Sequence, residues 1–334
     1  MSSHSLENDT PPASPDAVPT PSRKGSRKRV VGALVASRGA VAKTWRRAWS
    51  LRSGSAAKDP DLTLDLSPSN DASAADGLIL IQHAPPCATV ILNRPDHRNA
   101  ITMAMWSGLA EVFARLADDP AIRVIVIRGA GDKAFSAGAD IAEFRTRMIG
   151  QQLARDYWRV VDEANSAVEN CPKPVVALIG GFALGAACAL VSACDLRIAT
   201  PNAILGVPAA KIGLTLALND TRRLVNAVGA SHAREILLTG RLLSAAEALE
   251  VGLLNRVISV EDVGSELQSL VTSIAEQAPL ALRQAKTNLN IVARNPGFAG
   301  ISEIEVSLAW AGSHDFVEGI NAYLEKRKPH FTGE

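Results

Sequence analysis

The feature that most constrains the fold is a stretch of 20 residues without a charged side chain, Val175–Cys194. It is long enough to cross a lipid bilayer as a helix. However, Val175–Ile179 has the β-branched pattern of a strand, residues 180–181 are two turn-forming glycines, and small residues from Ala183 onward favour a helix. We therefore interpret the stretch as a buried strand-turn-helix and predict no transmembrane segment.

Strand and helix patterns alternate through the middle of the chain. Leu78–Ile81 and Ala88–Leu92 have the composition of short strands, Met103–Ala117 has helical apolar spacing, and Ile122–Ile127 is a β-branched run. From about residue 280 to residue 324 the spacing is mostly helical. This alternation predicts an α/β core that begins near residue 76.

The N-terminal 75 residues differ in charge from the rest. They carry 11 basic and 7 acidic residues, whereas the whole chain has 35 and 34. Ser/Pro-rich segments predict a disordered, basic extension over residues 1–75. Its acid-free run over residues 18–58 is compatible with weak membrane association, a nucleic-acid arm or a targeting segment. Acidic residues ahead of that run favour a solvated extension, or upstream sequence translated from a wrong start, and we expect no nucleic-acid partner.

The cysteines and histidines give no metal or redox signature. Four Cys and six His are present, with no C-x-x-C pair and no ligand spacing. We therefore predict no metal site and expect a reducing compartment, the cytoplasm.

Three motifs follow one another in a specific order. They are Asn93–Ala100 (NRPDHRNA), Ala134–Ile141 (AFSAGADI) and Gly180–Ala187 (GGFALGAA), the last followed by Cys194–Ala199. In this order they resemble the crotonase (enoyl-CoA hydratase/isomerase) superfamily, whose usual forms are NRPxxxNA, AFxAGADI and GxAxGGGxE. The likeness extends over about residues 77–331.

The resemblance implies a fold and an activity. The fold would be a crotonase-like spiral of ββα units over residues 76–270, with a C-terminal helical trimerisation region over residues 271–334. The protein would act on an acyl-CoA thioester without a prosthetic group, coenzyme A being part of the substrate. It would assemble as a homo-oligomer, a trimer or a dimer of trimers.

Site residues also follow from the resemblance. Backbone N–H groups of Ala139 and Ala186 would form an oxyanion hole for a thioester enolate, where small residues allow a close approach. The substrate's coenzyme A portion would contact Ala137, Gly138, Ala139, Asp140 and Gly185, the loop residues His97, Arg98 and Ala100, and Tyr323 and Lys326 from a neighbouring copy of the chain.

The chain departs from the hydratase pattern where acid–base chemistry is expected. Hydratases of the family use two glutamates, and the matching positions are Ala189 and Ala209. Methyl groups transfer no protons, so classical hydration is disfavoured and isomerase, decarboxylase or hydrolase chemistry fits better. The alternative is a non-catalytic acyl-CoA binder.

One acidic residue near the expected pocket has two interpretations. Asp220 could be a relocated catalytic acid or base. The interpretation that we favour is that it caps the helix that follows, since Asn219 and Asp220 precede a helical run.

Overall fold

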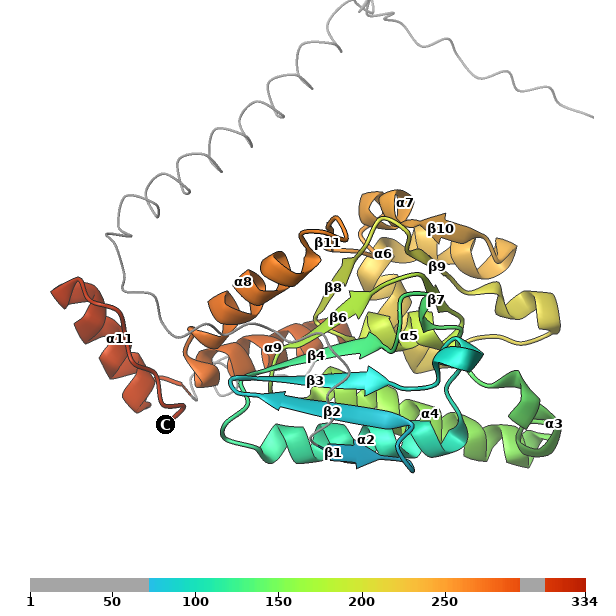
Figure 1. The fold of residues 1–334 in the computed structure, drawn as a ribbon, viewed down its shortest axis with the longest axis horizontal. Coiled ribbons are helices and arrows are strands. Elements are labelled where there is room, and N and C mark those ends of the chain that lie inside the picture. The colour runs from blue at the N-terminus through green and yellow to red at the C-terminus, as the bar shows by residue number, and fades with distance from the viewer. Residues whose placement is uncertain (1–71, 295–309) are drawn as a thin grey trace, which may run out of the picture. The chain divides into compact units, whose positions relative to one another are not determined.

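The computed structural model describes residues 72–294 and 310–334, and the prediction for the N-terminal extension lies almost wholly outside these residues (Figure 1). Seven strands form the larger sheet, in the order β1-β2-β3-β4-β6-β8-β11. They are β1 (Ala72–Ala74), β2 (Ile79–Ala84), β3 (Cys87–Leu92), β4 (Val124–Gly129), β6 (Val175–Ile179), β8 (Leu196–Ala199) and β11 (Arg256–Val257). β2 pairs antiparallel with both β1 and β3, and the pairing from β3 through β4, β6 and β8 to β11 is parallel.

A smaller sheet has the order β10-β9-β7-β5. Its strands are β5 (Ala134–Ser136), β7 (Phe182–Leu184), β9 (Ile204–Gly206) and β10 (Leu242–Ser244). The described helices are α2 (Met103–Asp118), α3 (Phe144–Arg147), α4 (Gln151–Asn170), α5 (Ala186–Ala193), α6 (Leu218–Thr239), α7 (Ala245–Glu250), α8 (Val263–Ala275), α9 (Pro279–Arg294) and α11 (His314–Glu325), with 3-10 turns η1 (Pro95–His97), η2 (Ile141–Glu143) and η3 (Pro208–Ile212).

The chain repeats one unit three times. Strands β4, β6 and β8 of the larger sheet are each followed by a strand of the smaller sheet and then by helices, which are α3 and α4, α5, and α6 respectively. This is the predicted spiral of ββα units, and the C-terminal helices are present as predicted.

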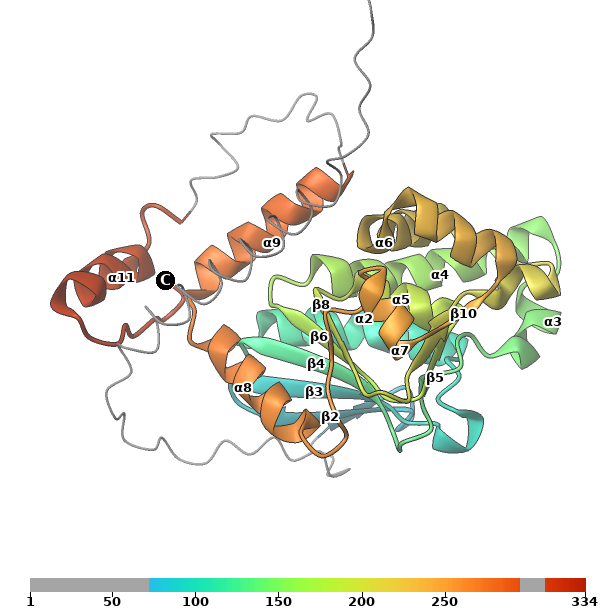
Figure 2. The same cartoon turned by 90° about the horizontal axis from the view of Figure 1, so that it is seen from above.

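Helices cover both faces of the larger sheet (Figure 2). Alternate residues of the central strands, such as Ile125 and Ile127, pack toward α2, α4 and α5. The intervening residues, such as Val124 and Val126, form a second cluster with α8. Burial on both faces explains why these strands are continuously apolar rather than alternating.

The sequence located most elements within a few residues. The strand Val175–Ile179 is confirmed, and so is the helix that begins at Met103. Two expectations were wrong in detail. The short strand β7 (Phe182–Leu184) precedes α5, which therefore begins at Ala186 rather than Ala183. Strand β1 (Ala72–Ala74) extends the sheet upstream of the predicted boundary.

Asn99 holds the loop that follows β3. Its backbone has φ 55°, a left-handed conformation that Asn tolerates better than most residues. Its buried side chain accepts from the N–H of Arg94 (3.0 Å) and donates to the carbonyls of Ala130 (2.9 Å) and Ala134 (2.8 Å). One side chain thus joins the loops that follow β3 and β4.

We predict that Asn99→Ala lowers the free energy of unfolding by about 3 kcal/mol, because it leaves buried backbone groups without partners. Chemical denaturation of the full chain measures the change. Gln151→Ala, at an exposed position at the start of α4, is the control and should cost less than about 0.5 kcal/mol. Equal losses in the two variants would contradict this role for Asn99.

Candidate active site

A cavity of about 310 Å³ lies between the ends of the smaller sheet's strands and helices α3 and α4. Two small-residue segments, 137–139 and 184–186, form one side of it. Aromatic side chains of α3 and α4 form another side, and residues of η3 and the loop before α6 complete the lining. The segments from the two glycine-containing motifs therefore meet at one cavity.

Gly138 brings those two segments together. Its φ is 100°, and a Cβ at this position would lie 2.5 Å from the carbonyl oxygen of Leu184 and 3.4 Å from the backbone nitrogen of Ala186. A side chain here would displace backbone, so only glycine permits the contact. Residues 138 and 186, far apart in sequence, are thus neighbours.

The two backbone groups that flank the N–H of Ala139 are both hydrogen-bonded to Ile101. The N–H of Ile101 donates to the carbonyl of Gly138 (2.8 Å), and the N–H of Asp140 donates to the carbonyl of Ile101 (2.9 Å). This parallel bridge turns the N–H of Ala139, which lies between the two bonded groups, away from Ile101. In residues 72–294 and 310–334 the N–H of Ala139 donates no hydrogen bond.

The second free N–H comes from the start of α5. Gly185, with φ 57° and ψ −119°, is the N-cap, and Ala186 is the first helical residue. The N–H of Gly185 donates to the carbonyl of Gly206 (2.8 Å), whereas the N–H of Ala186 donates to no acceptor in the described part of the chain. First-turn N–H groups and the helix dipole both favour a negatively charged partner.

The cavity lining includes no carboxylate, imidazole or thiol among the described residues. Ala209 lines the cavity, and Ala189 is buried in the core. The titratable side chains in the lining are Lys211 and Tyr157. Burial raises the pKa of Tyr157 to about 12, the neighbouring Trp106 side chain opposing this shift, so the phenol is protonated at neutral pH.

Asp140 makes hydrogen bonds within the loops beside the cavity, and it does not line the cavity itself. Its carboxylate accepts from Arg94 Nη1 (2.9 Å) and from the N–H of Ala142 (3.1 Å). Arg94 Nη1 also donates to the carbonyl of Ala100 (2.6 Å). Arg94 therefore joins the loop that follows β3 to the loop that follows β5.

The remaining predicted coenzyme A contacts are spread over two surfaces. His97 and Arg98 are exposed, and the Arg98 guanidinium lies 5.6 Å from the ring centre of Phe182. Tyr323 and Lys326 are exposed at the end of α11 and do not line this cavity. Their predicted role needs a second copy of the chain.

Asp220 belongs to a buried ion cluster. It is 1% exposed, accepts from Arg223 Nη1 (2.7 Å) and Asn165 Nδ2 (2.9 Å), and does not line the cavity. The capping interpretation was also wrong, since α6 begins at Leu218 with Ala217 as its N-cap. Burial raises the pKa of Asp220, against the lowering effect of Arg223.

Glu169 lies at the centre of the same cluster. Its carboxylate accepts from Arg222 (2.7 Å), Arg223 (3.0 Å) and Arg294 (2.9 Å), so it joins α4 to α6 and α9. Burial acts to raise the pKa of Glu169, but the three guanidinium groups outweigh it and hold the pKa below its usual value. The cluster fixes α4, whose residues line the cavity, against the start of α6, which directly follows the lining residues of the preceding loop.

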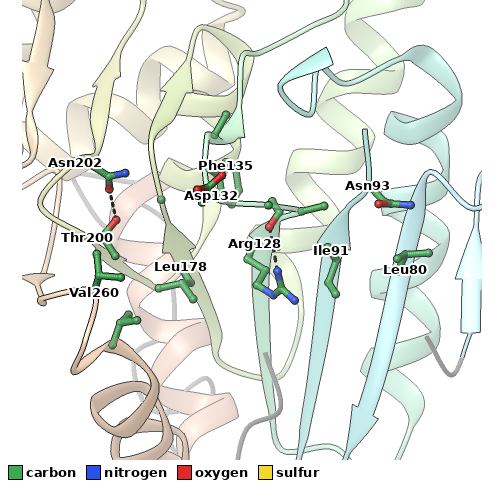
Figure 3. Close-up of a pocket in the computed structure, with 16 residues that line it drawn as sticks. Leu80, Ile91, Asn93, Arg128, Asp132, Phe135, Leu178, Thr200, Asn202 and Val260 are labelled. Atoms are coloured by element: carbon green, nitrogen blue, oxygen red, sulfur yellow. Dashed lines mark hydrogen bonds between the residues drawn. The ribbon is translucent and has the colours of Figure 1, made fainter. Parts of the chain in front are cut away.

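A second hollow, of about 530 Å³, lies on the outer face of the larger sheet (Figure 3). Its floor is one row of residues paired across adjacent strands: Leu80, Ile91, Arg128 and Leu178. This hollow could not be predicted from the sequence, because the row of residues is assembled from four separate strands. The aromatic lining of the first cavity could not be predicted either, since Tyr157 and Trp158 look like ordinary residues of an amphipathic helix.

The described residues contain no helix long and apolar enough to cross a membrane. Within the same ranges, no group of three or more His, Cys, Asp or Glu side chains is placed to hold a metal ion. All four cysteines are buried as free thiols. Burial raises the pKa of Cys188 to about 12, so its reactive thiolate is disfavoured.

Comparison with known proteins decides the family. The model of the enoyl-CoA hydratase/isomerase family matches residues 85–334. The chain belongs to this family. It is 33% identical to a crotonyl-CoA hydratase of Syntrophomonas wolfei over 77% of this chain and 98% of that protein. A solved enoyl-CoA hydratase/carnithine racemase from Magnetospirillum magneticum is 38% identical, with a TM-score of 0.73 over 77% of this chain and 96% of that one.

A human relative is similar in fold at lower identity. The solved structure of human enoyl coenzyme A hydratase domain-containing protein 3 is 28% identical, with a TM-score of 0.69 over 76% of this chain and all of that one. The crotonase fold expected from the motifs is therefore confirmed, and the family places the protein among acyl-CoA enzymes.

We predict that Glu169→Gln lowers the free energy of unfolding by about 3 kcal/mol at pH 7, since it leaves buried guanidinium groups without their anion. A group whose pKa is lowered on folding stabilises the protein above its unfolded pKa, and this stabilisation is lost as pH falls through the folded pKa. The difference between variant and parent should therefore shrink below about pH 4.5. Urea denaturation across this range tests it, and a difference that grew toward low pH would contradict the assignment.

Proposed function

We propose that the cavity binds the thioester end of an acyl-CoA and that the N–H groups of Ala139 and Ala186 form an oxyanion hole. The observation that carries this proposal is two free N–H groups from separate segments at one cavity wall, brought together at Gly138. Each such donor stabilises a developing oxyanion by roughly 3–4 kcal/mol. Coenzyme A is then part of the substrate, and no prosthetic group is required.

The lining of the cavity selects among reactions. Hydration, isomerisation and hydrolysis each need a base to activate water or to move a proton, and no carboxylate or imidazole of the described residues lines the cavity. Decarboxylation needs no protein base, because the substrate supplies the electron pair. We therefore favour decarboxylation of a 2-carboxyacyl-CoA over the other three reactions.

The proposed step is balanced without a co-reactant other than water. The bond between the α-carbon and the substrate carboxylate breaks, and carbon dioxide leaves. The electron pair forms the thioester enolate, whose oxygen accepts from the two N–H groups. Water then delivers a proton to the α-carbon, giving the shortened acyl-CoA, and the hydroxide that remains combines with the released carbon dioxide in solution to form bicarbonate.

The loop after β3 would hold the nucleotide end of the substrate. His97 and Arg98 are exposed there, and the carbonyl of Arg98 accepts from the N–H of Ala137 (2.9 Å), so this loop is joined to the oxyanion segment. A guanidinium is suited to phosphate recognition.

A non-catalytic acyl-CoA binder is the second candidate, favoured by the same lack of a base. Purified protein is incubated with methylmalonyl-CoA, crotonyl-CoA and a 3-enoyl-CoA, while carbon dioxide release, hydration and isomerisation are followed. Release of carbon dioxide alone supports decarboxylation. Calorimetric binding without turnover of any thioester supports the binder, and the absence of binding contradicts both.

The N–H of Ala186 can be removed without disturbing the helix. Ala186 is the first residue of α5, a position that proline tolerates. We predict that Ala186→Pro lowers kcat about 10²–10³-fold, because the oxyanion loses one donor. Ala186→Gly retains the N–H and should stay within a few-fold of the parent enzyme. Equal activity of the two variants would remove Ala186 from the oxyanion hole.

We also propose that the chain forms a homo-oligomer, a trimer or a dimer of trimers, through α11. This helix exposes Val317 (55%), Ile320 (44%) and Leu324 (71%), and an apolar hollow of about 440 Å³ lies between it and the start of α9. Such a patch on one helix is typical of an interaction surface.

We predict that Ile320→Glu combined with Leu324→Glu converts the oligomer to a monomer, because charged side chains cannot be buried unpaired in the interface. Sedimentation equilibrium measures the mass. Leu238→Glu, at an exposed position of α6, is the control and should keep the parent mass. A monomeric parent protein, or an unchanged mass in the double variant, would contradict the proposal.

A further inference from the structure

Three aromatic side chains form one wall of the candidate active-site cavity. Phe144 comes from α3, and Tyr157 and Trp158 come from α4. Aromatic residues make up only 4% of the whole chain. Their concentration at one cavity is not required by the oxyanion hole, which uses backbone groups alone.

Tyr157 is the rigid centre of this wall. It is 1% exposed, and its ring meets Phe144 edge to face, with centroids 5.5 Å apart and planes at 82°. Trp158 meets the same ring at 6.2 Å and 86°. The Tyr157 hydroxyl is buried without a hydrogen-bond partner among the described residues, and the neighbouring Trp106 is completely buried in the core.

The two outer rings keep surface available for a ligand. Phe144 and Trp158 are only half-buried, although both line the cavity. Aliphatic side chains, Leu184, Leu214 and Leu216, complete the apolar lining. A ligand group in this space would therefore contact aromatic rings that are already held in fixed orientations.

We infer that the acyl group of the substrate carries an aromatic ring, which packs against Phe144 and Trp158. This inference rests on the proposed binding of an acyl-CoA thioester in the cavity. An aromatic ring gains offset or edge-to-face contacts beyond the area it buries, and an alkyl chain does not. A rigid ring also loses less conformational freedom on binding than a flexible chain of the same size.

Three thioesters with the same number of acyl carbons separate these effects: 3-phenylpropanoyl-CoA, 3-cyclohexylpropanoyl-CoA and nonanoyl-CoA. Titration calorimetry with the full-length protein measures the dissociation constant of each. We expect the phenyl compound to bind about tenfold more tightly than nonanoyl-CoA, with the cyclohexyl compound between them. Nonanoyl-CoA binding as tightly as the phenyl compound would overturn the inference.

Two variants test whether Phe144 and Trp158 are the side chains that contact the ring of the acyl group. Phe144→Leu and Trp158→Leu should each lower the ratio of the nonanoyl-CoA dissociation constant to the phenyl-compound dissociation constant several-fold, while affinity for unacylated coenzyme A stays the same. Leu153→Ala, one turn earlier on α4 and outside the cavity lining, should leave the ratio unchanged. A ratio that persists in both aromatic variants would place the ring elsewhere.

The outcomes also distinguish this inference from the proposed function. If the acyl-CoAs bind without a preference for the ring, only the assignment of the acyl group fails. If neither coenzyme A nor any thioester binds, the proposed function fails as well.

Discussion

The close approach of two backbone segments at Gly138 is the interaction on which the candidate site depends. The carbonyl of Leu184 lies where any side chain at position 138 would begin, so the two glycine-containing motifs can approach each other this closely only because residue 138 is glycine. The contact places the free N–H groups of Ala139 and Ala186 at one wall. Donation by these N–H groups requires no particular side chain, which is why Ala186 can stand where the family motif usually has glycine.

The opposite side of the cavity is fixed by side chains. The carboxylate of Glu169 and the guanidinium of Arg223 hold α4 against α6, and α4 in turn presents Tyr157 and Trp158 to the cavity. A buried ion cluster is costly unless its partners match, and here each acidic group has at least one guanidinium neighbour. The cavity is therefore bounded by a backbone wall and by an aromatic wall, each held by its own network.

The sequence predicted the parts of the fold that depend on local pattern. Residues 175–179 form a strand because β-branched residues are buried on both faces of the sheet, and the motif glycines marked the turns around the cavity. The small strand β7 escaped prediction, because a three-residue strand beside two glycines has too little periodicity to detect. The motif resemblance identified Ala139 and Ala186, which the structure brings to one cavity.

Other features depend on contacts between distant residues. Asp220 looked like a helix cap, yet Arg223, one turn later on the same helix, and Asn165 on α4 bind its carboxylate in the interior. The aromatic wall could not be recognised either, because Phe144 and Trp158 border a cavity only once α3, α4 and the smaller sheet are assembled. Tertiary contacts, rather than local preferences, decide the roles of these residues.

A crystal structure with a stable acyl-CoA analogue would show whether a thioester oxygen binds between two backbone N–H groups in a cavity without a carboxylate. We expect the thioester oxygen to lie about 3 Å from the nitrogens of both Ala139 and Ala186. An analogue bound with this oxygen directed away from the two nitrogens, or in the hollow on the outer face of the larger sheet, would contradict it.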